Sequence, residues 1–428
     1  MILAKGKLYD NSAQEQILSG LAAEINLTRS EKELPLEAVI AALDKLGCMA
    51  ENGVFDARLA ELGLADLTAT VHEAACLLRR ESLLCKLRNE LGEAPFLPHS
   101  TAPPAGQTAL TTQLLPLGTL FHIAAGNLDG LPAVSVAEGL LTGNINLLKL
   151  PQADQGISIE ILQQLIALEP RISDFLYVFD TPSSDLAAMQ RLAELADGII
   201  VWGGDAAVTA VRHLAPVGAK LIEWGHKLGF AYISGDPPTA ELAELAEHIL
   251  FTKQLLCSSC QTIFLDSDAM DTVHAFCRRF LPLMEEAALR HPAGDISTAA
   301  EITLRRYHAR LERAMGGGAA DNLVYQGKYC CLTACQDSSL ALSDLFGSCL
   351  VKRLPRRSLF TQLRQHKGYL QTAGLICPEA ERPALANLLA RAGVTRVMRA
   401  GHMSATFCGE AHDGEYALRR YLRAVDIE

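Results

Sequence analysis

The sequence predicts an α/β protein with two α/β domains in succession, preceded by a helical N-terminal section. The length of 428 residues exceeds one ordinary core, so two domains are expected. Apolar residues at helical spacing fill residues 12–95, and short apolar strands alternate with helical segments after residue 106. Hydrophobic residues make up 49% and charged residues 20% of the chain, which is enough for packed cores and argues against long disordered segments.

The helical section is predicted from two amphipathic stretches. LEAVIAALDKLG at 36–47 and the long run at 60–91 both place apolar residues three and four positions apart. The segment PHSTAPPAG at 98–106 is rich in proline, which interrupts both helices and strands. We therefore expect the first α/β series to begin after this turn region.

Short apolar runs separated by helical segments form the first α/β series. Such alternation is typical of a parallel sheet covered on both faces, because each crossover helix packs back onto the sheet. The predicted strands are TLFHIAAG (119–126), INLLKL (145–150), FLYVFD (175–180), GIIVWGG (198–204) and KLIEW (220–224).

A second series of the same kind begins near residue 230. We expect a first domain over residues 1–229, a second over 230–404, and a terminal segment, 405–428, that packs back or mediates oligomerisation. The apolar runs of the second series are FAYIS (230–234), HILFTKQLL (248–256), QTIFLD (261–266), CLVKRLP (349–355), YLQTAGLIC (369–377) and TRVMRAG (395–401).

Charge and composition exclude several classes of protein. The net charge of −11 argues against a nucleic-acid partner, because phosphate binding needs a basic face. The N-terminus has no long apolar run behind a basic start, and the chain has no uninterrupted apolar run of about 18 residues, so neither export nor a membrane span is predicted. Twelve cysteines without a regular disulfide framework indicate reduced thiols and a cytoplasmic location.

The segment KQLLCSSCQTIFLD at 253–266 contains the candidate nucleophile, Cys257. Sulfur is intrinsically nucleophilic and needs only a modest lowering of its pKa to react near neutral pH. The alternative is a structural thiol, because cysteine is among the most buried residue types. Cys257 and Cys260 also form a C-x-x-C pair, but the cysteine group at 330–335 contains no second such pair, so no metal site is predicted.

The junctions between strands and loops in the first series carry candidate ligand-binding residues. Asn127 and Lys149 come where predicted strands end, and a lysine there can reach ribose hydroxyls or phosphate. Gly203 and Gly204 precede a predicted helix with Asp205 as its N-cap, and a glycine-rich turn before a helix is suited to phosphate. Ordinary turns are the alternative interpretation of each. The G-x-G-x-x-G fingerprint of a standard dinucleotide site is absent from the sequence.

The order of these motifs along the chain resembles that of the LuxC-type acyl-CoA reductases, a branch of the aldehyde dehydrogenase superfamily. The resemblance covers roughly residues 115–428 and implies an aldehyde-dehydrogenase-like fold. The helical N-terminal section resembles the family only loosely. The motifs that carry the resemblance are HIAAGN, LLTGNINLLKL, VWGGDAAV, EWGHKLGFAYIS, QLLCSSCQ, SDLFGSCLVKRL and the terminal HDGEYALRRYLRAVDIE.

The resemblance implies roles for individual residues. Cys257 matches the thiol that is acylated by a fatty acyl thioester, whereas Cys260 stands where the family commonly has proline. Asn127, with a one-residue shift in spacing, matches the asparagine that binds the thioester oxyanion. Glu223 matches the general base of the hydrolytic superfamily members, and Asp344 stands where those enzymes often carry a glutamate that holds the nicotinamide ribose. The implied cofactor-binding residues are Lys149, Gly203, Gly204, Asp205, Gly225 and Asp344.

The function implied by the resemblance is NADPH-dependent reduction of an acyl-CoA or acyl-protein thioester to the aldehyde through an acyl-cysteine, with NADH as the alternative cofactor. The sequence leaves two other functions open. If Glu223 activates water, the chain is a hydrolytic aldehyde dehydrogenase, and a noncatalytic relative would serve as a structural subunit of an acyl-transfer complex. The resemblance also implies a homodimer or homotetramer and an acyl-activating synthetase as partner.

Overall fold

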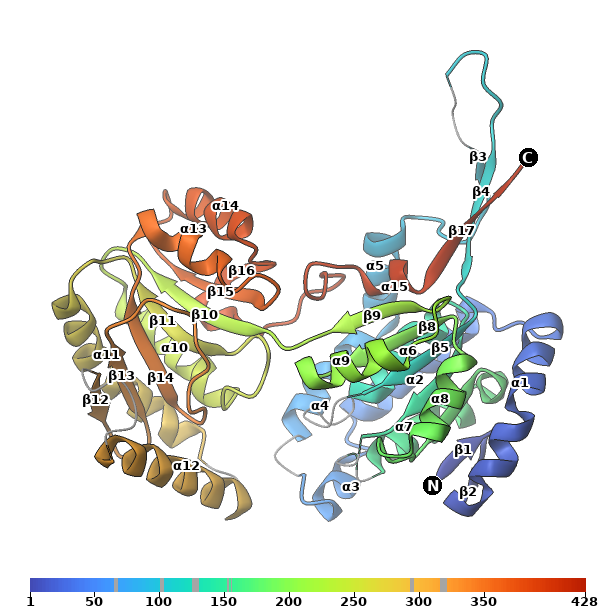
Figure 1. The fold of residues 1–428 in the computed structure, drawn as a ribbon, viewed down its shortest axis with the longest axis horizontal. Coiled ribbons are helices and arrows are strands. Elements are labelled where there is room, and N and C mark those ends of the chain that lie inside the picture. The colour runs from blue at the N-terminus through green and yellow to red at the C-terminus, as the bar shows by residue number, and fades with distance from the viewer. Residues whose placement is uncertain are drawn as a thin grey trace. The chain divides into compact units, whose positions relative to one another are not determined.

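Two compact units make up the chain in the computed structural model, which describes residues 1–64, 68–100, 104–124, 131–151, 154, 156–292, 296–315 and 322–428. The first unit comprises residues 1–225 and 407–428, and the second comprises residues 226–406 (Figure 1). The last residues of the chain therefore fold with the first domain. The boundaries expected from the sequence follow residues 229 and 404.

The helical N-terminal section packs on the first unit through one apolar face of each long helix. In α2 the residues Val39, Ile40, Leu43 and Leu46 are almost completely buried, as their three- and four-residue spacing predicts. The helices are α1 (Gln14–Glu31), α2 (Leu36–Glu51), α3 (Asp56–Glu61), α4 (Thr68–Ala75) and α5 (Arg80–Leu91).

A seven-stranded sheet with the order β2-β1-β7-β6-β5-β8-β9 forms the centre of the first unit. Strands β5 to β9 are parallel, but β1 pairs antiparallel with both β7 and β2, so the sheet is mixed rather than purely parallel as expected. The strands β1 and β2 have only three residues each, which is too short for a recognisable pattern. The bounds are β1 (Ile2–Ala4), β2 (Lys7–Tyr9), β5 (Thr119–Ile123), β6 (Ile145–Lys149), β7 (Leu176–Phe179), β8 (Gly198–Trp202) and β9 (Lys220–Trp224).

Successive strands are added to the sheet on one side of β5 and then on its other side. From β5 the chain steps to β6 and β7 on one side and then returns to β8 and β9 on the other. In open α/β sheets, ligands bind outside the carboxyl ends of the strands at such a switch point. The connecting helices are α6 (Leu131–Leu141), α7 (Ile157–Leu168), α8 (Leu186–Glu194) and α9 (Asp205–Leu214).

The C-terminal segment completes the first unit. Tyr421 is fully buried beside Leu120, Ile200 and Ile222 of the sheet, between α15 (Ala417–Arg420) and β17. A small antiparallel sheet then projects from the unit (Figure 1), in the order β17-β4-β3. Its strands are β17 (Leu422–Ile427), β4 (Thr111–Pro116) and β3 (His99–Ser100).

The second unit contains another seven-stranded sheet, with the order β12-β13-β14-β11-β10-β15-β16. All neighbours are parallel except the edge pair β12 and β13. The apolar run 248–256 is not a strand, because it forms the end of α10 and the turn that follows. The bounds are β10 (Leu228–Ile233), β11 (Cys260–Leu265), β12 (Leu323–Gln326), β13 (Cys331–Cys335), β14 (Ser348–Arg353), β15 (Leu370–Ile376) and β16 (Arg396–Arg399).

Helices cover both faces of the second sheet. In β10, Ala231 and Ile233 pack in the core that includes α10 and α11, whereas Phe230 and Tyr232 pack against α13 and α14. This alternation follows from the two-residue period of a strand, and it explains why the strand is apolar throughout. The helices are α10 (Thr239–Phe251), α11 (Met270–Arg290), α12 (Ile296–Ala314), α13 (Arg356–Arg364) and α14 (Arg382–Ala392).

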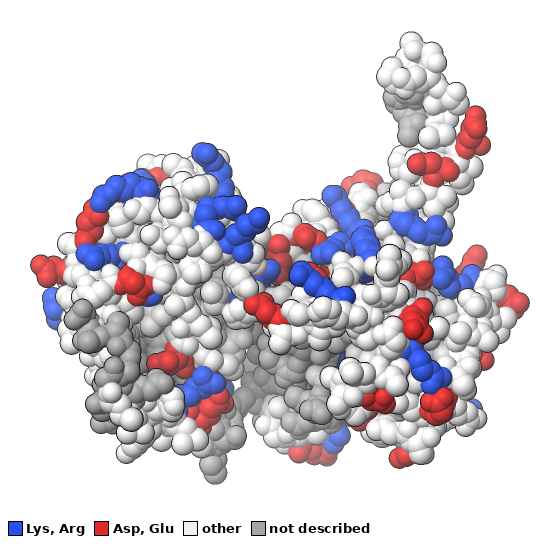
Figure 2. Space-filling model, in the orientation of Figure 1, with Lys and Arg blue, Asp and Glu red and all other residues white. Residues whose placement is uncertain are grey.

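The surface charge is unevenly distributed on this acidic chain. In the view of Figure 2, Lys and Arg side chains gather on the second unit over α13, α14 and β16, which carry the exposed Arg357, Arg364, Arg391 and Arg399. Among the helices described here, no helix combines the length and the apolar character that crossing a membrane requires.

Candidate active site

The candidate nucleophile Cys257 lies exposed in a turn between α10 and β11. The turn begins with Lys253 and Gln254, whose φ angles of 50° and 62° are left-handed. For residues with a Cβ this conformation costs about 1–2 kcal/mol each, so surrounding contacts must hold the turn. Strain of this kind clusters at functional sites.

Gln254 supplies those contacts from a buried position, with 1% of its surface exposed. Its Nε2 donates to the carbonyl oxygen of Cys260 at 2.8 Å, to Ser343 Oγ at 3.1 Å and to the carbonyl oxygen of Ser348 at 3.2 Å. Its Oε1 accepts from the backbone N–H of Gly347 at 3.0 Å. One side-chain amide thus ties the turn to β11 and β14.

A second strained turn packs against the first. Leu345, Phe346 and Gly347 have φ angles of 64°, 49° and 80°, and the N–H of Phe346 donates to the carbonyl oxygen of Lys253 at 3.1 Å. Asp344 is exposed and directly precedes this turn. The structure therefore brings the segments of Cys257 and Asp344 together within the second unit.

Strand β10 approaches the nucleophile turn so closely that only glycine fits. A Cβ at Gly229 would lie 2.5 Å from the carbonyl oxygen of Ser259 and 2.7 Å from that of Ser258. Ser259 is buried, and its Oγ accepts from the N–H of Leu256 at 3.1 Å. The turn that carries Cys257 is therefore packed closely against β10 and is closed by a hydrogen bond of its own.

The two thiols of the C-x-x-C pair have opposite environments. The exposed Cys257 Sγ accepts a hydrogen bond from Gln371 Nε2 at 3.2 Å. Cys260 is fully buried at the start of β11, and burial raises the pKa of its thiol to about 12. Because the thiolate is the reactive form, Cys257 is the better candidate for chemistry. Gln371 was not among the residues predicted from the sequence, where it is marked only as a polar residue near the start of an apolar strand.

Candidate cofactor-binding residues lie at the carboxyl edge of the first sheet. Lys149 ends β6 with 4% of its surface exposed, and burial lowers the pKa of its amine. Gly203 and Gly204 follow β8, and Gly204 is the N-cap of α9. The expectation that Asp205 caps the helix is wrong by one residue, because Asp205 is the first helical position, where the helix dipole stabilises its charge.

Glu223 lies in β9 and is engaged by an arginine. Arg212 of α9 donates from Nε to Glu223 Oε1 at 2.5 Å and from Nη2 to Oε2 at 2.7 Å. These hydrogen bonds lower the pKa of the Glu223 carboxyl. Gly225 follows β9 and ends the first unit. Asn127, the predicted oxyanion donor, lies outside the described residues, four positions after the end of β5.

The HDG motif is a tight turn that anchors the C-terminal segment. The N–H of His412 donates to the carbonyl oxygen of Glu415 at 2.9 Å, and the reverse bond is 2.8 Å. Asp413 has a φ angle of 51° and Gly414 one of 82°, as in the two-residue turns that favour Asp-Gly. The His412 ring packs 5.1 Å and 5.0 Å from the rings of Trp202 and Trp224, which end β8 and β9.

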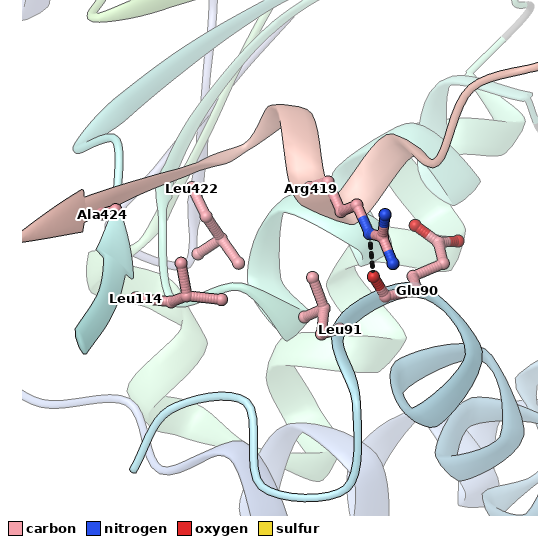
Figure 3. A pocket seen from close by; sticks show the side chains of 6 residues that line it. All are labelled: Glu90, Leu91, Leu114, Arg419, Leu422 and Ala424. Atoms are coloured by element: carbon pink, nitrogen blue, oxygen red, sulfur yellow. Dashed lines mark hydrogen bonds between the residues drawn. The ribbon is translucent and has the colours of Figure 1, made fainter. Parts of the chain in front are cut away.

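A pocket of about 360 Å³ opens in the first unit, but it contains none of the predicted site residues. Figure 3 shows the side chains of Leu91, Leu114 and Leu422 converging in it, with Arg419 Nε donating to the backbone oxygen of Glu90 at one end. The pocket therefore reflects the packing of α5 against β4 and β17.

Comparison with known proteins identifies the family of the chain. The acyl-CoA reductase (LuxC) family matches residues 32–424. The chain belongs to the LuxC acyl-CoA reductase family. The long-chain acyl-protein thioester reductase 2 of Photobacterium leiognathi is 26% identical over 329 residues, which are 73% of this chain and 65% of that protein. The corresponding reductase of Photorhabdus laumondii is 30% identical over 154 residues, 35% of this chain and 32% of that protein. The chain thus spans less than two thirds of these relatives.

Solved structures identify the fold as that of the aldehyde dehydrogenases. The chain superimposes on a bifunctional proline utilization A protein with a TM-score of 0.72 and 16% identity, over 99% of this chain and 46% of that one. An NAD-dependent benzaldehyde dehydrogenase from Corynebacterium glutamicum gives 0.69 and 12%, over 99% and 91%. The NADP-dependent glyceraldehyde-3-phosphate dehydrogenase from Bacillus halodurans gives 0.69 and 14%, over 98% and 91%. The predicted fold class is confirmed.

Proposed function

We propose that this protein reduces an acyl thioester to an aldehyde through a covalent acyl-Cys257, with NADPH as the source of hydride. One observation carries the proposal. The exposed residue Cys257 lies on a strained turn that the buried amide of Gln254 holds, while the neighbouring thiol of Cys260 is buried in the sheet. Backbone strain clusters at functional sites, and a reactive cysteine has to be accessible to its substrate.

The chemistry needs two transfers at one carbonyl carbon. The thiolate of Cys257 attacks the substrate thioester, the carrier leaves as a thiolate, and an acyl-cysteine forms. The nicotinamide cofactor, when bound, supplies the hydride that replaces sulfur on the acyl carbon. The products are the aldehyde, the regenerated Cys257 thiolate and the oxidised cofactor. We assign Asn127 and the N–H of Cys257 as donors to the oxyanion of each tetrahedral intermediate.

A nicotinamide dinucleotide fits the residues at the carboxyl edge of the first sheet. Lys149 of β6 and the glycine turn before α9 lie on either side of β5, at the switch point where α/β sheets bind nucleotides. The N-terminus of α9 would attract the pyrophosphate, and the Lys149 amine would contact the adenosine ribose or its 2′-phosphate. We assign Gly203, Gly204 and Asp205 to the same site. Gly225 of the first unit and Asp344 of the second unit stay predicted cofactor contacts, each by itself.

Reduction is favoured over hydrolysis by the state of Glu223. Hydrolysis of an acyl-cysteine requires a base that activates water, whereas both carboxylate oxygens of Glu223 accept hydrogen bonds from Arg212. The same contact lowers the pKa of Glu223 and makes it a weaker base. If hydrolysis of the acyl-cysteine is slow, hydride transfer can occur before the acyl group is lost as the free acid.

The names of the relatives guide the choice of acyl donor. Both relatives described above are called long-chain acyl-protein thioester reductases. We propose a long-chain acyl group carried on a protein or on CoA as the substrate. A cytoplasmic homodimer or homotetramer that receives acyl groups from an activating synthetase is consistent with this proposal.

Intact mass spectrometry tests the proposal directly. The protein is incubated with an isotopically labelled long-chain acyl-CoA, with and without NADPH, and the same is done for Cys257→Ser and Cys260→Ser. Cys48→Ser, at an exposed position in the first unit, is the matched control. We expect an acyl adduct on the wild type, on the control and on Cys260→Ser, and none on Cys257→Ser.

The fate of the adduct separates the candidate functions. Disappearance of the adduct upon addition of NADPH, with release of labelled aldehyde, supports the reductase. Decay to the fatty acid without cofactor points to hydrolysis, and a wild type that forms no adduct with an acyl-CoA or an acyl-protein contradicts the proposal. Replacing NADPH by NADH in the same assay measures the cofactor preference.

A further inference from the structure

We propose that Gln371 is a positioning residue for the nucleophile: its side-chain amide donates a hydrogen bond to the sulfur of Cys257 and stabilises the thiolate. The proposal rests on the proposed function, in which Cys257 is the acylated thiol. Gln371 Nε2 lies 3.2 Å from Cys257 Sγ. An amide dipole that points its N–H at a developing negative charge favours the charged form and lowers the thiol pKa.

The position of Gln371 makes this contact effective. Only 5% of its surface is exposed, so the amide is largely shielded from water, whereas the residue that it contacts, Cys257, is exposed. A hydrogen bond from a shielded donor is electrostatically stronger than one in water. A neutral donor also leaves the site without an added charge before and after the thiol is acylated.

An irregularity of β15 directs Gln371 toward the nucleophile turn. Leu228 of β10 pairs with Leu370, but the next aligned pair is Phe230 with Ala373. The two residues Gln371 and Thr372 therefore oppose the single residue Gly229. A bulge of this kind changes the direction of a side chain, and bulges are common beside active sites.

A matching irregularity occurs in the strand on the other side of β10. Gly229 pairs with Cys260 and Phe230 with Thr262, so Gln261 is the extra residue of β11. Gln261 Nε2 donates to the carbonyl oxygen of Gln254 at 2.8 Å, and its Oε1 accepts from Ser343 Oγ at 2.7 Å. Both bulged strands thus direct a glutamine amide to the segment that carries Cys257: Gln261 holds the backbone of the turn and Gln371 contacts the sulfur.

The orientation of the Gln371 amide is fixed by its neighbours. Its Oε1 accepts from Thr372 Oγ1 at 3.3 Å, which leaves the Nε2 group directed at the sulfur. Its backbone carbonyl accepts from the N–H of Thr395 at 3.1 Å and from Thr395 Oγ1 at 3.3 Å. Preorganisation of this kind means that little reorganisation is needed when the thiol ionises.

The test compares two replacements of Gln371. If Gln371 acts by packing, the glutamate variant should react faster than the methionine variant; if it acts by stabilising the thiolate, the glutamate variant should react more slowly. Gln371→Glu keeps the shape of the side chain but presents a carboxylate to the sulfur, whereas Gln371→Met fills similar space without a donor. The full-length proteins are treated with iodoacetamide at neutral pH, and the alkylation rate of the Cys257 peptide is followed by mass spectrometry. Ultraviolet thiolate absorbance is measured as the difference from Cys257→Ser, and Gln365→Met, at an exposed position after α13, is the control.

We expect alkylation of Cys257 to slow about tenfold in Gln371→Met, as for loss of one hydrogen bond to a charged group. Gln371→Glu should be slower still, with a parallel loss of thiolate absorbance, and the control should match the wild type. Rates within twofold of wild type in both variants, or a Glu variant faster than the Met variant, would overturn the proposal. If Gln371→Met fails to fold, the isosteric Gln371→Glu decides alone. Alkylation needs no acyl substrate, so failure of the proposed function would appear separately, as rapid alkylation of Cys257 without acylation.

Discussion

Gln254 illustrates how a single side chain can hold a reactive turn in place. Its amide bonds to β11 and to residues 343–347, and its own backbone carries a left-handed φ angle of 62°. The sequence indicates that Gln254 belongs to the same motif as Cys257, but it assigns the residue no role. The role depends on Gly347 and Ser348, which lie more than 90 positions away in the chain.

Gln254→Ala should destabilise the second unit by about 2–4 kcal/mol, because it leaves buried donors and acceptors unpaired. It should also slow alkylation and acylation of Cys257, since the turn is no longer held. Urea unfolding followed by circular dichroism measures the first effect, and iodoacetamide labelling measures the second. Gln365→Ala, at an exposed position, serves as the control. Wild-type stability in Gln254→Ala would contradict this role.

His122 makes the stability of the first unit depend on pH. It is fully buried, with Nδ1 beside Ser135 Oγ at 2.7 Å and Nε2 beside Asn146 Oδ1 at 2.9 Å, and burial lowers its pKa from 6.5 to about 4. Between these values the unfolded chain binds a proton that the folded unit does not bind. The contribution of the neutral His122 ring to the free energy of unfolding is therefore complete above about pH 6.5 and is lost as the pH falls toward 4.

The pH dependence can be measured selectively. Both tryptophans of the chain, Trp202 and Trp224, lie in the first unit, so their fluorescence reports its unfolding. The wild type should lose up to about 3 kcal/mol between pH 6.5 and 4 through this one group, and His122→Gln, which keeps a donor and an acceptor, should lose less. The exposed His213→Gln is the control. Equal slopes for His122→Gln and the wild type would remove His122 as the cause.

At the scale of elements, the two units use opposite edges of their sheets. In the first unit the candidate cofactor residues lie at the carboxyl ends of β6, β8 and β9, whereas in the second unit Cys257 precedes the amino end of β11. In the second unit the edge is shaped by Gly229, which faces bulges in the strands on both sides. The close approach of β10 to the nucleophile turn follows from this arrangement.

Gly229→Ala should push β10 away from the nucleophile turn. The new Cβ would meet backbone carbonyl atoms of Ser258 and Ser259, which cannot move aside as a side chain can, so we expect a cost of about 1–3 kcal/mol and slower alkylation of Cys257. Thermal unfolding measures the loss of stability, and iodoacetamide labelling measures the alkylation rate of Cys257. Gly20→Ala in α1, where no atom lies within 4 Å of the added Cβ, should be neutral or stabilising. Unchanged reactivity in Gly229→Ala would show that the close approach is dispensable.

At the scale of the whole molecule, the chain leaves the first unit at residue 225 and re-enters it at residue 407. The re-entering segment is fixed by the HDG turn and by Tyr421, whose backbone oxygen accepts from Asn144 Nδ2 at 3.1 Å. The first unit therefore needs the last residues of the chain for its core.

Tyr421→Ala should cost the first unit about 3–5 kcal/mol, because it removes a fully buried aromatic ring and leaves a cavity. Tryptophan fluorescence during urea unfolding measures the loss. Ile427→Ala, at a position that is 53% exposed in β17, should have little effect. A small loss in Tyr421→Ala would mean that the terminal segment contributes little to the core.

The sequence by itself determined the fold class and the order of motifs, because helical and strand periodicity and the spacing of glycine and proline act locally. It also led to Cys257, through a short motif around one thiol. It did not indicate β1, the antiparallel edges of the sheets or Gln371, since short strands and bulges carry no local pattern. The prediction that Asp205 is the N-cap of α9 was wrong by one residue, because the residue at which a helix begins depends on backbone geometry and not on residue type alone.

Only the tertiary structure decided how the two thiols differ. In the sequence, the C-x-x-C spacing alone does not distinguish Cys257 from Cys260, and only the family resemblance favours Cys257. In the fold, one begins a central strand and is desolvated, while the other lies in a turn held by Gln254 and contacted by Gln371. The reactivity of a thiol depends on its solvation and its hydrogen bonds, and here residues far from it in the chain supply both.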